Sequence, residues 1–341
     1  MELNLIAKPY IIAEAGTNHN GSVDVALKLV DLAKNAGANS VKFQIINPEG
    51  LYIPFIYIDG VSKPNPVIEQ RKKFMLTDYE YEKVASYTKE LGLDFSASVF
   101  DEKSLNLLLK FDPEYIKIAS CDLNNISFLK KVAEKATEKK AYIILSTGMS
   151  LLDEIEKAIS ELFNNGFKDI VILHCVSVYP AGLKQMNLAF IDVLKNTFQF
   201  PVGLSDHTDN SISAAIALSK GATYFEKHIT LDKKQEGFDH AYASEENDFR
   251  QYISDIHNVY EALQYNQIKL KDEEINVKKR ARRSLYAIRK LEKGEIIEDE
   301  DILIVRPEAI LNADQVNLIL GKRCKKTIMQ YQPFSLNLIE E

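Results

Sequence analysis

The chain has 341 residues, of which 46% are hydrophobic and 27% charged, a composition typical of a globular protein with a sizeable core. Its length suits one large and one small domain. The net charge of −7 argues against a nucleic-acid-binding surface, which normally needs a basic face. A small anionic ligand remains compatible with this charge, because a few lysines can dominate the potential of a cleft.

The sequence also lacks signals for membrane insertion and secretion. No stretch approaches the ~20 consecutive apolar residues of a membrane span, and the first residues lack the basic and apolar regions of a signal peptide. The three cysteines, Cys121, Cys175 and Cys324, have no paired spacing. Reduced thiols are the simplest interpretation, so we expect a cytoplasmic protein without membrane contacts.

Short apolar runs alternate with amphipathic segments over the first two thirds of the chain. The eight runs span residues 10–13, 40–43, 94–98, 115–119, 141–145, 170–174, 202–205 and 223–225. The segments between them have helical apolar spacing, and Gly37, Gly92 and Gly166 each end such a segment. Eight βα units predict a closed (β/α)8 TIM barrel, with a doubly wound open sheet as the alternative.

Two regions depart from this alternation. Residues 48–66 are rich in Pro, Tyr and Ile after the second strand, and we interpret them as a lid or substrate loop, or as an inserted surface loop. A polar stretch then precedes a tail with short β-like runs and turn signals. The predicted domains are therefore a barrel at 1–264, a linker at 265–282 and a small β-rich domain at 283–341.

Two histidines follow the last two β-like runs of the predicted barrel. His207 and His228 are separated by a segment of helical length. Neighbouring parallel strands lie ~4.8 Å apart, so two such imidazoles can share one divalent metal ion. Most histidine pairs at this spacing are structural or exposed, but the acidic neighbours Asp206, Glu226 and Asp239 favour the metal interpretation.

Polar residues at the carboxyl ends of barrel strands meet in one pocket. Each of the eight runs brings at least one: Glu14, Asn18, His19, Lys42, Gln44, Ser98, Asp101, Lys117, Ser120, Asp122, Ser146, Thr147, Ser177, Tyr179, Ser205, His207, Glu226 and His228. For Asp101 we favour capping of the following helix.

The two lysines in this set, Lys42 and Lys117, lie within apolar runs, where a lysine should face an anion or an acidic partner. Together with several serine hydroxyls they provide what a phosphate group needs. A pair of metal-binding histidines beside a phosphate pocket predicts carbon–carbon or phosphoryl chemistry on a small phosphorylated substrate.

Seven motifs occur in order along the chain: IIAEAGTNHNGS (11–22), VKFQ (41–44), YIKIAS (115–120), ILSTGM (144–149), LHCVSVYP (173–180), GLSDHT (203–208) and EKHIT (226–230). They resemble the sialic acid synthase family, whose members condense phosphoenolpyruvate with a 2-acetamido sugar into nine-carbon α-keto acids. The stretch ARRSLYAIRKLEKGEIIEDEDILIVRP (281–307) looks like the SAF (antifreeze-like) domain of that family. The resemblance therefore implies a TIM barrel followed by an SAF domain.

The resemblance also implies roles for single residues. Phosphoenolpyruvate would be bound by Lys42, Ser98, Lys117, Ser120, Ser146, Ser177 and Ser205. The sugar would be bound by Gln44, Asp122, Tyr179, Asp239 and Arg306, and catalysis would involve Glu14, Tyr179, Glu226 and Asp239. The metal, Mn²⁺ with Mg²⁺ or Co²⁺ as alternatives, would be bound by His207 and His228. Arg306 would come from the SAF domain of a second subunit, which implies a domain-swapped homodimer.

Some positions depart from the family's pattern and leave other functions open. Phe238 stands in a Gly-Phe-Asp sequence where Gly-Pro-Asp is usual, and Val99 replaces a proline. The sugar could thus be N-acetylmannosamine or a precursor of legionaminic or pseudaminic acid. A related synthase acting on an aldose phosphate is an alternative, which the SAF-like tail disfavours. A catalytically silent binding protein is another, which the retained lysines and histidines disfavour.

Overall fold

The computed structural model describes residues 7–264 and 269–340. The chain divides into two compact units, a large one formed by Leu3–Tyr265 and a small one that contains Asn266–Glu341. Within the described residues, no helix is long and apolar enough to cross a membrane. The two units are described in turn.

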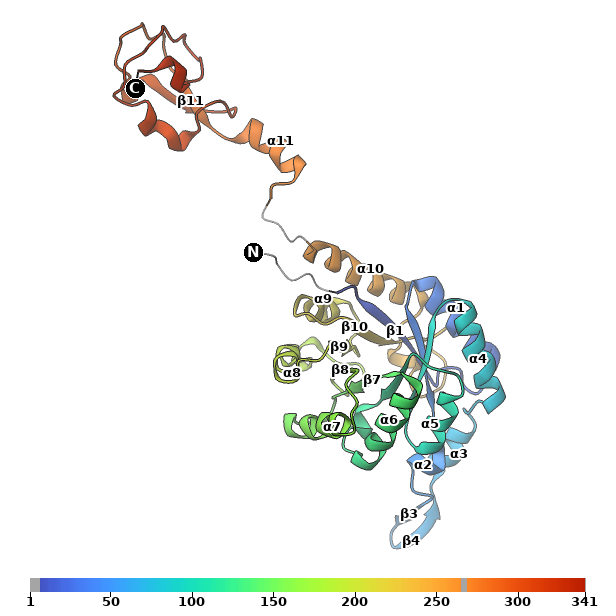
Figure 1. The fold of residues 1–341 in the computed structure, drawn as a ribbon. Helices are drawn as coiled ribbons and strands as arrows, with labels where there is room; N and C mark the ends of the chain where they lie inside the picture. Colours follow the sequence, from blue (N-terminus) through green and yellow to red (C-terminus); the bar gives the residue numbers. More distant parts are fainter. Residues whose placement is uncertain (1–6, 265–268, 341) are drawn as a thin grey trace. The chain divides into compact units, whose positions relative to one another are not determined.

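The large unit is built on a closed barrel of eight parallel strands, with the order β1-β10-β9-β8-β7-β6-β5-β2 (Figure 1). The strands are β1 (Tyr10–Gly16), β2 (Ser40–Ile45), β5 (Asp94–Val99), β6 (Tyr115–Ile118), β7 (Tyr142–Ser146), β8 (Ile170–Cys175), β9 (Val202–Ser205) and β10 (Tyr224–His228). The first strand pairs with both β2 and β10, which closes the sheet. The predicted TIM barrel is confirmed, and the open doubly wound sheet is excluded.

Helices follow the barrel strands and cover the outside of the barrel. They are α1 (Val23–Ala36), α4 (Asp78–Glu90), α5 (Glu102–Leu109), α6 (Ile126–Lys139), α7 (Leu152–Asn164), α8 (Phe190–Phe198), α9 (Ile212–Ser219) and α10 (Glu246–Leu263). Local signals set their ends: Thr77 and Glu80 form a capping box at the start of α4. Asp101 caps α5, as predicted, by accepting a hydrogen bond from the Ser104 N–H at 2.8 Å. Gly37 ends α1 with φ of 95°, a conformation that favours glycine.

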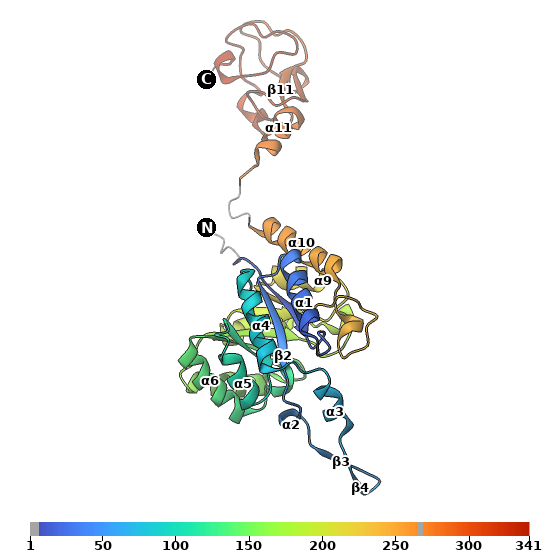
Figure 2. The ribbon, with the colours of Figure 1, turned by 90° about the vertical axis from the view of Figure 1, so that its right-hand side faces the viewer.

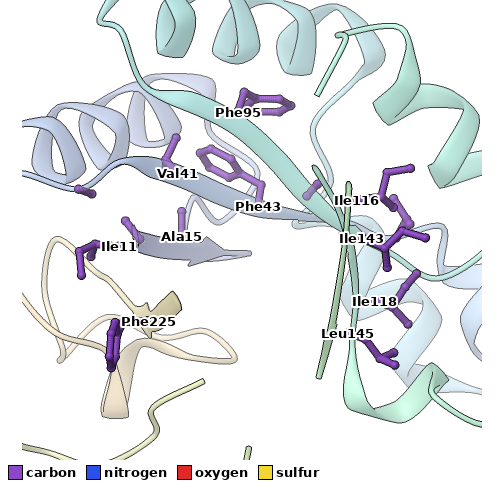
Figure 3. Close-up of a cluster of buried hydrophobic side chains, with 14 of the residues drawn as sticks. Ile11, Ala15, Val41, Phe43, Phe95, Ile116, Ile118, Ile143, Leu145 and Phe225 are labelled. Atoms are coloured by element: carbon purple, nitrogen blue, oxygen red, sulfur yellow. The ribbon is translucent and has the colours of Figure 1, made fainter. Parts of the chain in front are cut away.

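Side chains alternate between the two faces of each strand. Outward residues such as Val41, Phe43 and Phe95 pack with the helices into the main core (Figure 3). Inward residues nearer the amino ends of the strands form a second buried cluster: Ile12, Tyr115, Ile144, Val171 and Leu173. A β-carbon at Gly203 would lie 2.3 Å from the carbonyl oxygen of Tyr224, so only glycine fits there.

This inner cluster determines where the polar residues lie. Two residues beyond Ile12, Tyr115 and Ile144, on the same inward face, stand Glu14, Lys117 and Ser146. The apolar cluster closes the barrel below them. The polar side chains of the next layer therefore form the floor of a pocket at the carboxyl ends of the strands.

The segment between β2 and α4 is folded rather than a plain loop. It contains α2 (Pro48–Leu51), an antiparallel hairpin of β3 (Phe55–Ile58) and β4 (Val61–Pro64), and α3 (Pro66–Lys72). The hairpin turns at Asp59 and Gly60, both with positive φ, as a two-residue turn with Asp-Gly requires. The hairpin extends away from the barrel in both views (Figures 1 and 2).

The small unit has its own core and few regular elements. Helix α11 (Asp272–Ala281) precedes two antiparallel strands, β11 (Ser284–Ala287) and β12 (Ile302–Val305). Isolated β-bridges join the remaining turns, and Leu285, Ile328 and Phe334 are fully buried among its apolar side chains. The β-rich character expected of this domain is confirmed. Of the predicted linker, residues 265–268 lie outside the described residues, and α11 occupies much of the rest.

Candidate active site

A cavity of 280 Å³ opens at the carboxyl ends of the barrel strands. Most of the residues proposed from the sequence line it: Glu14, Lys42, Gln44, Ser98, Lys117, Ser120, Ser146, Ser177, Tyr179, Ser205, His207, Glu226 and His228. The barrel topology brings these residues together from strands spread over more than 200 positions of sequence. We call this cavity the catalytic pocket.

The two lysines face carboxylates and hydroxyls at the bottom of the pocket. Lys42 is ion-paired with Glu14 and lies 3.5 Å from Glu226, and its Nζ donates to Ser98 Oγ at 3.0 Å. The Nζ of Lys117 donates to Ser146 Oγ at 2.6 Å and lies 4.0 Å from Glu226 Oε1. Both lysine side chains are at most 3% exposed. Such buried cations need the anionic or hydroxyl partners that they have here.

The two carboxyl groups differ in their proton affinity. Burial raises the pKa of Glu14 to about 7; Lys42 opposes this shift, and the neighbouring Glu226 adds to it. Burial also acts to raise the pKa of Glu226, but Lys117, Lys42 and the hydrogen bond from Ser205 outweigh it and lower the pKa to about 2. The pocket thus combines a permanently charged carboxylate with one that can carry a proton near neutral pH.

The histidines lie side by side above the lysines, with ring centroids 5.6 Å apart. The Nδ1 of His207 lies 2.8 Å from the Val176 carbonyl oxygen, so Nδ1 carries the proton and Nε2 is an acceptor. Burial lowers the pKa of His228 to about 4, which keeps its ring neutral. Within the described part of the chain, the Nδ1 of His228 has no hydrogen-bond partner, and Asp239 Oδ2 lies 3.9 Å away.

Burial acts to lower the pKa of His207, but Cys175 and the Val176 carbonyl outweigh it and raise the pKa. Imidazole nitrogens with a free lone pair fit a divalent metal ion. Among residues 7–264 and 269–340, no group of three or more His, Cys, Asp or Glu side chains is arranged to hold one. A metal bound here would therefore take two protein ligands and complete its shell with water or substrate. The ring of Tyr179 lies against His207, with centroids 4.1 Å apart.

The remaining proposed residues lie outside the pocket lining. Asp239 belongs to the loop after β10 and accepts a hydrogen bond from the Tyr242 hydroxyl, at the edge of the histidine pair. Asp122 is 8% exposed and lies in the 3-10 turn after β6, beside Cys121. Arg306 is an exposed residue of the small unit, directly after β12.

Sequence reasoning also missed residues of the pocket and included His19, which does not belong to it. Cys121, Met149 and Cys175 line the catalytic pocket. Cys175 could have been found by counting in twos from the inward Leu173; the expected strand instead ended at His174, which faces outward and bonds to the Met186 carbonyl. His19 is fully buried against Phe43 and Tyr81, so it belongs to the core.

Comparison with known proteins assigns the family. Residues 29–268 match the NeuB family and residues 282–336 the SAF domain. The chain therefore belongs to the NeuB family, which confirms the resemblance seen in its motifs.

Several similar proteins carry the names of synthases of sialic-acid-like acids. The N,N'-diacetyllegionaminic acid synthase of Legionella pneumophila is 33% identical over 92% of this chain and 90% of its own length. The pseudaminic acid synthase of Campylobacter jejuni is 33% identical over 95% of each chain. An uncharacterized protein of Methanocaldococcus jannaschii is 36% identical over 93% of this chain and 90% of its own.

A solved structure agrees with these relatives. The N-acetylneuraminic acid synthetase of Leptospira borgpetersenii, crystallised with citrate, superimposes with a TM-score of 0.69 at 30% identity. The match covers 81% of this chain and 95% of that one. The general class of the protein is thus that of nonulosonic acid synthases.

Proposed function

We propose that this protein condenses phosphoenolpyruvate with an open-chain 2-acetamido sugar, giving a nine-carbon α-keto acid and inorganic phosphate. The observation that carries the proposal is the floor of the catalytic pocket. There, two buried lysines, two carboxyl groups and a set of serine hydroxyls lie next to two histidines. The names of the relatives support the product class.

The lysine side of the pocket suits phosphoenolpyruvate. Lys117 donates to the Ser146 hydroxyl and the Ile118 carbonyl and has only a distant carboxylate, so its charge is available to the phosphate or carboxylate of that substrate. Lys42 and the serine hydroxyls complete this half of the site: Ser98, Ser120, Ser146, Ser177 and Ser205. Glu14, Gln44, Tyr179 and Asp239 then remain for the sugar. We also assign Asp122, in the 3-10 turn after β6, to sugar binding.

Bond formation in this proposal runs from phosphoenolpyruvate to the sugar. Carbon 3 of phosphoenolpyruvate attacks the aldehyde carbon, the aldehyde oxygen takes up a proton, and positive charge develops at carbon 2. The charged Glu226 stabilises that cation. Water adds to carbon 2 and gives up a proton, for which Glu14 has a suitable pKa. The carbon–oxygen bond to phosphate then breaks, and the hydroxyl on carbon 2 gives its proton to the departing phosphate, leaving the keto group and inorganic phosphate.

His207 and His228 would hold the divalent metal, Mn²⁺ by the resemblance, which would supply Lewis-acid polarisation of the aldehyde. Arg306 of a second subunit is the further group that we assign to the sugar. An arginine can grip sugar oxygens with its planar set of donors. We therefore also propose a domain-swapped homodimer, with the domain limits predicted from the sequence.

The test is phosphate release from phosphoenolpyruvate in the presence of single sugars, together with a Lys117→Met variant. We expect release only with a 2-acetamido sugar. The variant should raise the KM for phosphoenolpyruvate about ten- to a hundredfold, because loss of a charged hydrogen-bond partner costs ~1.5–3 kcal/mol. The exposed Lys157, paired with Asp153 on α7, provides the control Lys157→Met, which should behave as wild type.

Other outcomes would replace the proposal. Release with aldose phosphates alone would favour the related synthase of eight- or seven-carbon acids. Phosphoenolpyruvate binding without turnover of any sugar would indicate a silent homologue. Calorimetry showing wild-type phosphoenolpyruvate affinity in Lys117→Met would mean that Lys117 is a structural cation.

A further inference from the structure

Tyr242 lies beside the histidine pair but outside the catalytic pocket. Its ring centroid is 5.3 Å from that of His228, with the rings edge-on at 80°, and 4.8 Å from that of Tyr179. It lines a separate cavity of 410 Å³ on the side of α10 and is not among the residues that line the catalytic pocket. Tyr242 can therefore act on a reactant only through its neighbours.

A short turn brings the Tyr242 hydroxyl to Asp239. The two residues stand three positions apart, at the two ends of the 3-10 turn His240–Tyr242, and side chains at that spacing lie over one another in such a turn. The hydroxyl donates a hydrogen bond to Asp239 Oδ1. The turn is anchored to β10, because the Ser244 N–H that follows it donates to the His228 carbonyl at 2.8 Å.

The other oxygen of Asp239 faces His228. Oδ2 lies 3.9 Å from the His228 Nδ1, which is fully buried and, over the described residues, has no hydrogen-bond partner. A β-carbon at Gly16 would lie 3.0 Å from the same oxygen, so the backbone at the end of β1 limits the movement of the carboxylate. Tyr242 and Gly16 together thus keep the carboxylate next to Nδ1.

This contact distinguishes the two ring nitrogens of His228. The residue lines the catalytic pocket while its Nδ1 is buried near Asp239, so the ring meets the pocket with the side that carries Nε2. A carboxylate favours the tautomer whose N–H faces it, because the other tautomer turns a lone pair toward the negative charge. With the proton on Nδ1, the Nε2 lone pair is free for a metal ion.

We propose that Tyr242 is a positioning residue, which acts through Asp239 to hold the proton of His228 on Nδ1 and the Nε2 lone pair toward the pocket; this rests on the proposed metal binding by the histidine pair. For His207 the Val176 carbonyl has the same role. The two histidines are thus oriented by different means, and the orientation of His228 depends on a side-chain hydroxyl.

The test measures the ring tautomer and the metal affinity separately, on the full chain. Nitrogen NMR of the histidine rings in the metal-free protein, assigned with His228→Gln, reports which nitrogen carries the proton. Calorimetry with Mn²⁺ alone gives the affinity. Tyr242→Phe keeps the ring and removes only the hydroxyl, so we expect the Nε2–H tautomer of His228 to appear. The Mn²⁺ affinity should fall about three- to tenfold, less than the ~10–100-fold typical for loss of an outer partner, because Asp239 remains.

Two further variants separate this role from a structural one. Tyr87→Phe is the matched control, because the half-buried Tyr87 donates from its hydroxyl to Asp31 at 2.6 Å, between α4 and α1. It should leave the tautomer and the Mn²⁺ affinity as in wild type. Asp239→Asn should itself weaken Mn²⁺ binding ~10–100-fold. In that background Tyr242→Phe should change neither readout further, because its action passes through the carboxylate.

A wild-type value of either readout in Tyr242→Phe overturns the inference. An equal loss of affinity in Tyr87→Phe, or a further loss from Tyr242→Phe in the Asp239→Asn background, overturns it as well. If the wild-type protein does not bind Mn²⁺, the metal assignment in the proposed function fails. The ring tautomer of His228, compared between wild type and Tyr242→Phe, then decides the inference alone.

Discussion

The most completely buried histidine of the barrel, His19, is a site where folding and proton binding oppose each other. Its side chain is 0% exposed and packs against Phe43 and Tyr81, with ring centroids 6.0 and 6.4 Å away. Its Nδ1 accepts the Gly21 N–H at 3.1 Å, which occupies the lone pair that a proton would use. Burial lowers the pKa of His19 to about 4, with Glu80 opposing this shift weakly.

We therefore expect His19 to make the protein sensitive to mild acid. Below its ordinary pKa of ~6.5 the unfolded state binds a proton that the folded state does not bind until about pH 4. The contribution of neutral His19 to the free energy of unfolding is therefore complete above pH 6.5. It falls by about 3 kcal/mol as the pH drops toward 4. Urea unfolding at pH 7 and pH 4.5 measures the loss.

The variant His19→Gln should lose less stability over this interval than wild type, and the half-buried His257 of α10 provides the control His257→Gln. Other buried histidines, such as His228, titrate in all three proteins and cancel in the comparison. An acid-induced loss in His19→Gln as large as in wild type would assign the sensitivity elsewhere.

Single residues also show what the sequence can and cannot predict. Lys42 and Lys117 could be assigned to the pocket because a lysine within an apolar strand needs an anionic or hydroxyl partner, and the pocket residues supply such partners. The placement of His19 failed because the turn after β1 directs its ring into the core, a result of tertiary packing. The contact between Asp239 and His228 depends on an irregular loop, which has no periodicity to read.

At the scale of elements, the outward face of β10 contacts the end of β9 and helix α10 through a buried lysine. Glu226 and His228 face the pocket, so Lys227 between them faces outward. Its Nζ donates to the Thr208 carbonyl at 2.5 Å, lies 3.9 Å from Asp206 Oδ2 and 4.8 Å from the Tyr252 ring centroid. Asp206 and Thr208 flank His207, so this buried cation joins β10, the end of β9 and α10 behind the histidine pair.

Replacing Lys227 with methionine should destabilise the barrel and loosen His207. The change leaves Asp206 buried without its cation, which typically costs ~3–5 kcal/mol. Urea denaturation measures the loss, and Lys227→Met with Asp206→Asn should recover part of it, since the unpaired charge is then gone. The exposed pair of Lys233 and Asp248, at 2.7 Å, supplies the control Lys233→Met, expected to lose less than ~1 kcal/mol. A Lys227→Met protein as stable as wild type would contradict this role.

The eight barrel strands were predictable because apolar runs and helical spacing alternate regularly. The segment 48–66, between β2 and α4, was expected to be a loop, although Asp59-Gly60 between apolar residues is a strong hairpin signal. Its strands carry exposed apolar side chains such as Phe55 and Tyr57. An alternation of apolar and polar residues, by which a half-buried strand is recognised, is therefore missing from this segment.

At the scale of the whole molecule, the chain joins two units with separate cores, and the proposed chemistry needs both. The barrel unit contains the lysines, carboxyl groups and histidines. Arg306 lies in the small unit, exposed beyond β12, where its guanidinium is available to a ligand. In the proposed swapped dimer, each active site would combine the barrel of one subunit with Arg306 of the other.

Mixing two inactive variants tests this arrangement. His207→Ala disables its own barrel, and Arg306→Ala disables the site that its small unit completes. After subunit exchange, half of the dimers are mixed and each has one intact site, so about a quarter of wild-type activity should return. The exposed Arg323, which donates to the Gly294 carbonyl within the small unit at 2.9 Å, gives the control Arg323→Ala, which should be active alone. If mass measurements confirm exchange and no activity returns, Arg306 does not act across subunits.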